Sequence, residues 1–204
     1  MVTTIVSRYN EDLLWLDGIF TNVVIYNKGS TLDEQALSLK EGRELYQLKV
    51  YHLENIGREA HTYLHHIVNN YNNLATWNIF LQGNPFDHCP EVIRLVNDFP
   101  QCAGELNKFS EGCYSLANRI LKEDQSFLSG LGVYAEDLHY KTFNSSKQYF
   151  VYASGAQYIV HKQNILNRPK EFYMDLLNSY NWNTHMPWSI ERIWPEIFNI
   201  DYSK

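Results

Sequence analysis

A chain of 204 residues with a formal net charge of −6 suits one α/β domain whose core is built in three layers. Its charged residues form no basic run, which argues against a protein that tracks the backbone of a nucleic acid. No apolar stretch reaches the roughly 18 residues that a membrane-spanning helix needs. The first residues also lack the basic start and apolar run of a secretory signal.

The cysteines and aromatic residues add two further expectations. Cys89, Cys102 and Cys113 are odd in number and form no C-x-x-C pair, which favours free thiols in a reducing compartment. We therefore expect a cytoplasmic domain, either the whole protein or one domain of a longer chain. The 15 tyrosines and five tryptophans can fill a core or, at the surface, stack on sugars and bases.

Two strands are expected near the N-terminus, at residues 3–9 and 22–27, because β-branched and apolar residues dominate there. The first strand ends in the polar residues Ser7, Arg8, Tyr9 and Asn10. Asn10 also fits the N-cap of a helix over residues 11–16, whose acidic first turn suits the helix dipole, and both roles can hold together. Residues 31–44 are charged, which predicts an excursion over the surface with a short helix around Leu37.

Residues 48–88 predict a β-α-β unit around which the sheet is organised. Strands are expected at residues 48–53 and 77–82, and apolar residues at helical spacing predict an amphipathic helix over 58–71. The two strands should be parallel with a right-handed crossover. Ligands of such sheets bind beyond the carboxyl ends of the strands. We therefore expect the site among the polar residues there, which are Asn55, Arg58, Gln82, Gly83, Asn84, Asp87 and His88.

Arg58 and two histidines of the predicted helix have alternative interpretations. Arg58 lies in the first turn, where unpaired backbone N–H groups and the helix dipole attract anions, and its guanidinium suits a diphosphate. It could equally form a surface ion pair with Glu54 or Glu59. His61 and His65 have the i, i+4 spacing of a zinc-chelating pair. With no third ligand indicated nearby, they also fit ordinary positions beside an apolar helix face.

The second half of the chain is less regular. Helices are expected at residues 89–100, 116–121, 170–177 and from Ser189 onward, strands at 148–152 and 156–161, and a turn at 129–132. Ser189 fits an N-cap, which puts Glu191 in the first turn of the last helix, where the dipole would keep its pKa low. Asp137 is the other acidic candidate in this half of the chain.

Three segments carry a resemblance to known families, and they read NIGREAHTYLHHIVNNY…IFLQGNPFDH, GAQYIVHKQNILNRPKEFY and ERIWPEIF. The order of strand, N-x-G-R-E turn, helix, strand and polar glycine-containing turn resembles the first half of a GT-A nucleotide-sugar transferase. The amino-acid sequences of these segments are similar to those of an uncharacterised family called domain of unknown function 3431. They are also similar to glycosyltransferase domains of chlorella-type large DNA viruses. The resemblance covers most of the chain, with a weak middle at residues 90–149. It departs from the GT-A pattern where Gln82-Gly83-Asn84 replaces the Asp-x-Asp metal motif.

The resemblance implies a GT-A-like, Rossmann-like α/β fold with a mixed, mainly parallel central sheet flanked by helices. The implied activity transfers a hexose or deoxyhexose from a nucleoside-diphosphate sugar, most simply a UDP-sugar, to a hydroxyl of a glycan or glycoprotein, such as a viral capsid glycan. The enzyme would work in the cytoplasm, that of the host cell if the protein is viral.

The resemblance also assigns roles to residues. Those matched to the donor site are Ser7, Arg8, Tyr9, Asn10, Asn55, Arg58, Gln82, Gly83, Asn84, Gly155, Ala156 and Gln157. A divalent cation would be held by Asp87, by His88 or His185 and by the phosphates of the nucleotide, and Mn²⁺ is favoured over Mg²⁺ because it accepts imidazole more readily. Glu191, or Asp137 in its place, would be the catalytic base of an inverting enzyme.

Two other functions stay open at this point. A catalytically silent module of the same fold, binding a sugar or a protein partner, is supported by the missing Asp-x-Asp. A zinc hydrolase would be built on His61 and His65.

Overall fold

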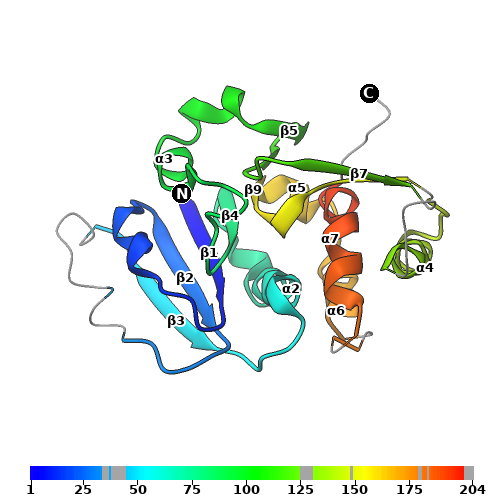
Figure 1. The fold of residues 1–204 in the computed structure, drawn as a ribbon, viewed down its shortest axis with the longest axis horizontal. Helices are drawn as coiled ribbons and strands as arrows, with labels where there is room; N and C mark the ends of the chain where they lie inside the picture. The colour runs from blue at the N-terminus through cyan, green and yellow to red at the C-terminus, as the bar shows by residue number, and fades with distance from the viewer. Residues whose placement is uncertain are drawn as a thin grey trace.

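The centre of the protein is one sheet of seven strands in the order β3-β2-β1-β4-β9-β6-β5, seen in a computed structural model (Figure 1). The structure describes residues 1–33, 37, 45–124, 131–147, 149–178, 181–182 and 184–199. The strands of this sheet are β1 (Val2–Arg8), β2 (Asn22–Asn27), β3 (Leu48–His52), β4 (Trp77–Gln82), β5 (Asn107–Ser110), β6 (Cys113–Ser115) and β9 (Tyr158–His161). A separate antiparallel pair is formed by β7 (Ile120–Asp124) and β8 (Tyr149–Ala153).

The strand directions confirm a mixed, mainly parallel sheet. Strands β3, β2, β1 and β4 pair in parallel, whereas the pairings of β4 with β9, β9 with β6 and β6 with β5 are antiparallel. Five of the seven strands therefore run in one direction. Strands β3 and β4 are parallel, as the β-α-β pattern predicts, with β2 and β1 lying between them.

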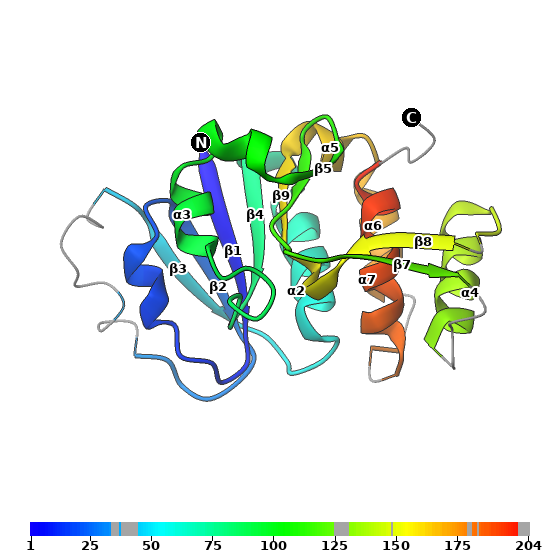
Figure 2. The same ribbon diagram turned by 45° about the horizontal axis from the view of Figure 1, so that its top comes forward.

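Helices cover both faces of the sheet (Figure 2). The α-helices are α2 (Arg58–Asn70), α3 (Val92–Asn97), α4 (Leu131–Phe143), α5 (Lys162–Leu166), α6 (Lys170–Asn178) and α7 (Met186–Ile197). The 3-10 turns are η1 (Leu14–Gly18), η2 (Tyr71–Asn73), η3 (Gln101–Glu105) and η5 (Ser154–Ala156). Successive side chains of a strand point to opposite faces, so Ile5 packs with α2, α6 and α7, and Val6 packs with η1 and α3.

Three local predictions are wrong, two because a partner distant in the sequence binds the segment and one because a helix begins earlier than expected. Residues 116–121 are not a helix, since Leu116 N–H donates to the Gln157 carbonyl (3.0 Å) and β7 begins at Ile120. Asn10 caps no helix; its side-chain oxygen accepts from Ser30 N–H (2.9 Å), and the first helical turn starts at Leu14. Ser189 is not a cap either, because α7 already begins at Met186.

Helix α4 is absent from the sequence-based prediction. Leu131 and Gly132, expected in a turn, are its first residues, whereas residues 129 and 130 lie outside the described part of the chain, as does most of the 31–44 excursion. Helix α4 packs against α7, and its buried residues Ala135 and Leu138 belong to the same core cluster as that helix.

In the part of the chain that the structure describes, no helix has the length and apolar character to cross a membrane. The three cysteines are free and buried.

Of the three histidines of α2, His66 is buried and His61 and His65 are partly buried, and together they should make stability depend on pH. His66 lies against Tyr26, whose hydroxyl is 3.0 Å from His66 Nδ1, and against Phe80. Burial lowers the pKa of His66 to about 3 and that of His61 to about 4, and it also lowers the pKa of His65.

We expect the free energy of unfolding to fall as the pH drops from about 6.5 toward 4. In this pH window the histidines bind protons in the unfolded chain, where their pKa is about 6.5. The same histidines do not bind protons in the folded protein, so protonation favours unfolding. Glu191, whose pKa is raised to about 7, acts in the opposite direction, because the folded state protonates it first. His66→Gln should remove up to about 1.4 kcal/mol per pH unit from the slope. Denaturant unfolding at several pH values measures this, with the exposed His52→Gln as the matched control. Equal slopes for the two variants would contradict the assignment.

Candidate functional site

The carboxyl ends of the four parallel strands open into one cavity. The chain runs from β1 outward to β2 and β3 and then returns to β4 on the other side of β1. Such a reversal in strand order creates a crevice at the sheet edge, and here Ser7 and Gln82 are register neighbours at the carboxyl ends of the paired strands β1 and β4. The crevice is a cavity of about 450 Å³, called here the strand-end cavity. It is lined by Ser7, Arg8, Tyr9, Glu11, Lys28, Asn55, Arg58, Glu59, Gln82, Gly83, Asn84 and Asp87.

Most of the predicted donor-site residues meet in this cavity. Of the twelve, eight line it, and Asp87 from the predicted metal set lines it as well. Asn10 lies outside the lining and binds Ser30 instead. Ala156 and Gln157 are fully buried beneath the sheet edge, where Gln157 Nε2 donates to the Pro85 carbonyl (3.0 Å). Both residues therefore support the site from the interior of the protein and do not line it.

Two of the lining residues shape the cavity through their bonds to the protein. The buried Arg8 guanidinium donates to the Asn27 side chain (2.7 Å) and to the carbonyls of Ser30 (2.9 Å) and Glu11 (2.9 Å). It thereby ties together the loops that follow β1 and β2. The Ser7 hydroxyl lies 2.9 Å from the Thr62 hydroxyl, which fixes the end of β1 against α2.

Sequence reasoning missed Lys28 and Glu11. Lys28 follows β2 directly, so the strand-end rule that found Asn55 and Gln82 also applies to it. Its buried ammonium donates to the carbonyls of Ile56 (2.6 Å) and Arg58 (2.5 Å). Burial lowers its pKa to about 8, with the Glu59 carboxylate opposing the shift. Glu11 accepts from Tyr9 N–H (2.6 Å).

The turn before α2 holds an unusual backbone conformation. Gly57 and Arg58 both have positive φ values, 64° and 49°. Glycine is required at position 57, because a Cβ atom there would lie 2.6 Å from the Trp182 ring. A long side chain at positive φ is uncommon and marks strain that surrounding structure must hold, often at functional sites. The result is that the N-terminus of α2 and the Arg58 side chain both reach the strand-end cavity.

Arg58 lies between an acid and an aromatic ring. Its guanidinium is 3.6 Å from the Glu59 carboxylate and 5.5 Å from the centre of the Trp188 ring. The ion pair with Glu59 was one of the two expected interpretations, and it is present. Because the Arg58 side chain is still 56% exposed, it remains accessible to an anion.

A second cavity of about 400 Å³ joins the first, and we call it the Glu191 cavity. The two share Arg58, Glu59, Gln82 and Asp87. The remaining lining consists of His88, Arg119, Leu121, Ser154, Gly155, Pro187, Trp188 and Glu191. We call the two adjoining cavities together the cleft; Lys28 lines only its strand-end part, and the Glu191 carboxylate lines only the other part. Arg119 is a further basic residue of this lining that sequence reasoning missed, because the sequence pattern predicts a helix at residues 116–121, away from the site.

Glu191 has the opposite electrostatics to those expected. It is the sixth residue of α7, beyond the first turn where the helix dipole acts. Burial raises the pKa of its carboxyl to about 7; the Gly155 N–H bond to Oε1 (2.8 Å) opposes this, Glu59 adds to it, and Arg192 and Arg58 oppose it. The predicted low pKa is therefore wrong. A carboxyl with a pKa near neutrality can take or give a proton at working pH.

Gly155 brings the backbone to the wall of the Glu191 cavity. It has φ +77°, and a Cβ atom at this position would lie 2.3 Å from the His88 ring. Only glycine allows this contact and the N–H bond to Glu191 at the same time. Of the predicted segment 155–157, Gly155 is the residue that lines the cleft.

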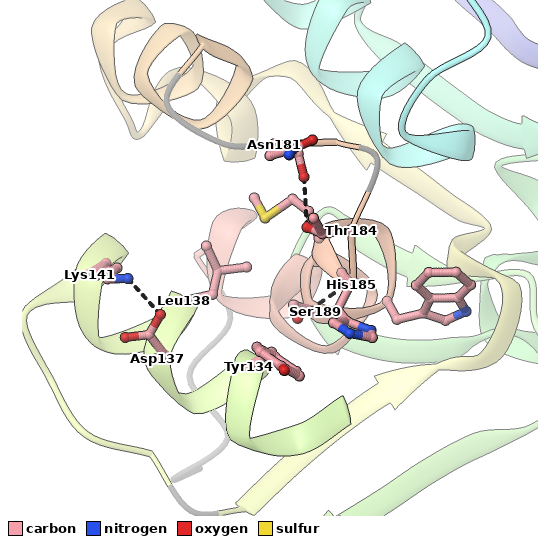
Figure 3. Close-up of a pocket in the computed structure, with 10 residues that line it drawn as sticks. Tyr134, Asp137, Leu138, Lys141, Asn181, Thr184, His185 and Ser189 are labelled. Carbon is pink, nitrogen blue, oxygen red and sulfur yellow. Dashed lines mark hydrogen bonds and ion pairs between the residues drawn. The ribbon is translucent and has the colours of Figure 1, made fainter. Parts of the chain in front are cut away.

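Asp137 and His185 lie in a different place. Both line a third cavity between α4 and the start of α7, as Figure 3 shows. Asp137 forms an ion pair with Lys141 (2.6 Å), and the His185 ring stacks on Tyr134 with centroids 4.4 Å apart. The structure therefore does not bring His185 to Asp87 and His88.

The described residues do not form a metal site by themselves. No group of three or more His, Cys, Asp or Glu side chains within the described ranges could hold an ion. Asn84 Nδ2 donates to Asp87 Oδ2 (3.3 Å), so part of that carboxylate is already engaged. His61 and His65 face aromatic rings, those of Trp182 and Tyr26, and act as packing residues.

Fold and site together define an α/β protein with a cleft at the topological switch point of its sheet. Residues 4–98 match the model of a family described as Protein of unknown function (DUF3431), which supports the resemblance to that family over this part of the chain. The match contains the whole lining of the strand-end cavity, whereas Gly155 and Glu191 lie outside it. No curated protein and no solved structure matches the chain.

Proposed function

We propose that the protein is a glycosyltransferase that moves a sugar from a UDP-sugar to a hydroxyl group of a glycan or glycoprotein. The observation that carries the proposal is the joined cleft. One half holds cationic groups at the carboxyl ends of parallel strands, and the other half holds a buried carboxylate with a pKa of about 7. A nucleoside diphosphate needs the first arrangement, and a hydroxyl that must lose a proton needs the second.

The strand-end cavity would take the nucleotide. Arg58, Lys28 and the N-terminal N–H groups of α2 would face the diphosphate, and the half-exposed Tyr9 ring offers a stacking surface for the base. The lining contains three carboxylates, Glu11, Glu59 and Asp87, and three strong bases, which include Arg8. Because these formal charges cancel, the cavity favours the diphosphate through the placement of its cations rather than through net charge.

The sugar would extend into the Glu191 cavity, and we propose direct inversion there. The acceptor O–H proton passes to a Glu191 carboxylate oxygen while the acceptor oxygen forms a bond to the anomeric carbon. The bond from that carbon to the diphosphate oxygen breaks, and UDP leaves with the electron pair. Arg58, which lines both halves, is placed to stabilise the charge that develops on the leaving group.

A divalent cation is not required by this scheme, but a bound diphosphate would leave the neutral cavity with excess negative charge. The described residues offer no three-ligand site, so a Mn²⁺ ion would depend on phosphate oxygens beside Asp87. We therefore expect Mn²⁺ to bind weakly alone and more strongly with UDP.

The second candidate function is a catalytically silent module that binds a sugar or a protein partner. It is favoured by one observation, that Gln82-Gly83-Asn84 occupies the end of β4 in place of a pair of acids.

Thermal unfolding with UDP, GDP and CMP, each with and without Mn²⁺, tests the proposal. UDP at about a hundredfold excess over its Kd should raise the Tm by about 5–10 °C, more with Mn²⁺ present, because binding to the native state stabilises it. GDP and CMP should have smaller effects. If no nucleotide raises the Tm, the catalytically silent module is favoured. If Zn²⁺ alone raises the Tm, a zinc hydrolase built on His61 and His65 is favoured.

A further inference from the structure

A cavity of about 960 Å³ lies between α4 and the N-terminal end of α7. We call it the α4–α7 cavity. Figure 3 shows Tyr134, Asp137 and Lys141 entering from α4, with His185 and Ser189 opposite them. Its volume is at the upper end of the range for small-ligand sites and exceeds what a single sugar ring fills.

The lining combines flat rings with hydrogen-bonding groups. Tyr134 stacks on His185 with ring planes 17° apart, and both contribute to the wall. Around them lie hydroxyl, amide and charged groups, including Thr184 and Asn181. Sugars present apolar C–H faces and a rim of hydroxyl groups, which this mixture matches.

The charge of the cavity points to a neutral occupant. Its one carboxylate and its one ammonium group, Asp137 and Lys141, form an ion pair with each other. Both side chains are 56% exposed, so they can also meet the hydroxyl groups of a ligand. Phosphate, nucleotide and acidic lipid headgroups would find no unpaired strong base among the described lining residues.

The α4–α7 cavity shares a wall residue with the Glu191 cavity, which holds the proposed catalytic carboxylate. Trp188 lines both the α4–α7 cavity and the Glu191 cavity. Ser189, which lines the first, precedes Glu191 by two residues on α7. A chain of sugars seated in the α4–α7 cavity could therefore extend past Trp188 and place its terminal hydroxyl beside Glu191.

We propose that the α4–α7 cavity binds the acceptor and that the acceptor is a neutral oligosaccharide. This inference rests on the proposed transferase function, since it assigns the second substrate of the same cleft. Tyr134 and Trp188 supply the sugar-binding surfaces, and the Asp137–Lys141 pair binds hydroxyl groups. The donor and the acceptor then approach the Glu191 cavity from opposite ends.

The test uses saturation-transfer NMR on the whole protein with four probes, cellotriose, chitotriose, mannotriose and xylotriose. At least one should receive saturation from the parent protein, and Tyr134→Ala should weaken its binding about 5- to 10-fold. Tyr140→Ala is the matched control, because Tyr140 lies on the same helix at similar exposure, 55% against 48% for Tyr134, outside the cavity lining. Alanine suits a helix, so both variants should fold.

Titration with UDP in parallel separates the two proposals. Normal UDP binding to Tyr134→Ala together with weakened trisaccharide binding supports the acceptor site. If no probe receives saturation, or if Tyr134→Ala and Tyr140→Ala behave alike, the acceptor assignment is overturned while UDP binding still supports the transferase. Loss of UDP affinity in Tyr134→Ala would also overturn it, because the cavity would then belong to the donor. If a trisaccharide binds and UDP does not, the α4–α7 cavity is a sugar-binding site, and the proposed transferase function is refuted.

Discussion

Glu191→Gln is expected to lower turnover by about 10²–10⁴-fold, the usual loss when a general base is removed, with UDP affinity nearly unchanged. Gln has the shape of Glu, and its amide oxygen can still accept the bond from Gly155 N–H, which is 2.8 Å long in the parent. The variant therefore keeps the backbone of the cleft and loses the group that accepts the proton. Initial rates of UDP release with acceptor present measure the loss.

The pH dependence of kcat/KM should reflect the ionisation of the Glu191 carboxyl. Burial raises the pKa of Glu191 to about 7, and a general base must be ionised to act. The parent kcat/KM should therefore rise with pH up to about 7 and fall again above about 8, where the Lys28 ammonium that faces the diphosphate loses its proton. The residual activity of Glu191→Gln should lack that rise.

Asp137→Asn is the comparison variant. Asp137 lines the α4–α7 cavity, apart from the Glu191 cavity, so its loss should raise the KM for the acceptor more than it lowers kcat. If Glu191→Gln transfers sugar at nearly the parental rate and Asp137→Asn does not, the base is Asp137. A product with retained anomeric configuration, read by NMR, would remove the need for either.

The parallel part of the fold is predictable from sequence because its signals are local. Strand patterns over a few residues locate β1, β2, β3 and β4, and each observed boundary lies within a residue of the expected one. The donor end of the site follows from the same signals, since parallel strands bring their carboxyl ends to one edge. Lys28 could have been included by that rule.

The second half of the site depends on contacts that a local pattern does not contain. Pro187 in the first turn of α7 is a start signal that competes with Ser189, and it moves Glu191 away from the helix end. The pKa of Glu191 then depends on burial and on Gly155, 36 residues earlier in the chain. The α4–α7 cavity likewise exists only because α4, joined to the sheet through β7 and β8, packs on α7.

Arg58→Ala is expected to weaken UDP binding by about 1.5–3 kcal/mol, the range for hydrogen bonds to charged groups. This corresponds to an increase of about 10- to 150-fold in Kd. Alanine at this position adopts the same backbone, φ 49°, so the parent and the variant carry similar strain. Arg58→Lys keeps the charge without the planar fork of the guanidinium and should lose an intermediate amount.

The control for this effect is Arg119→Ala. Arg119 lines the Glu191 cavity without lining the strand-end cavity, whereas Arg58 lines both. If UDP occupies the strand-end cavity, calorimetric titration should show a large loss for Arg58→Ala and little change for Arg119→Ala. Unchanged UDP affinity in Arg58→Ala would mean that Arg58 does not bind the diphosphate. Its role would then be limited to its contacts with Glu59 and Trp188. An equal loss of affinity in both variants would instead place the diphosphate in the Glu191 cavity. Glu191 would then lie on the same side of the sugar as the leaving group, and it could not act as the base of an inverting reaction.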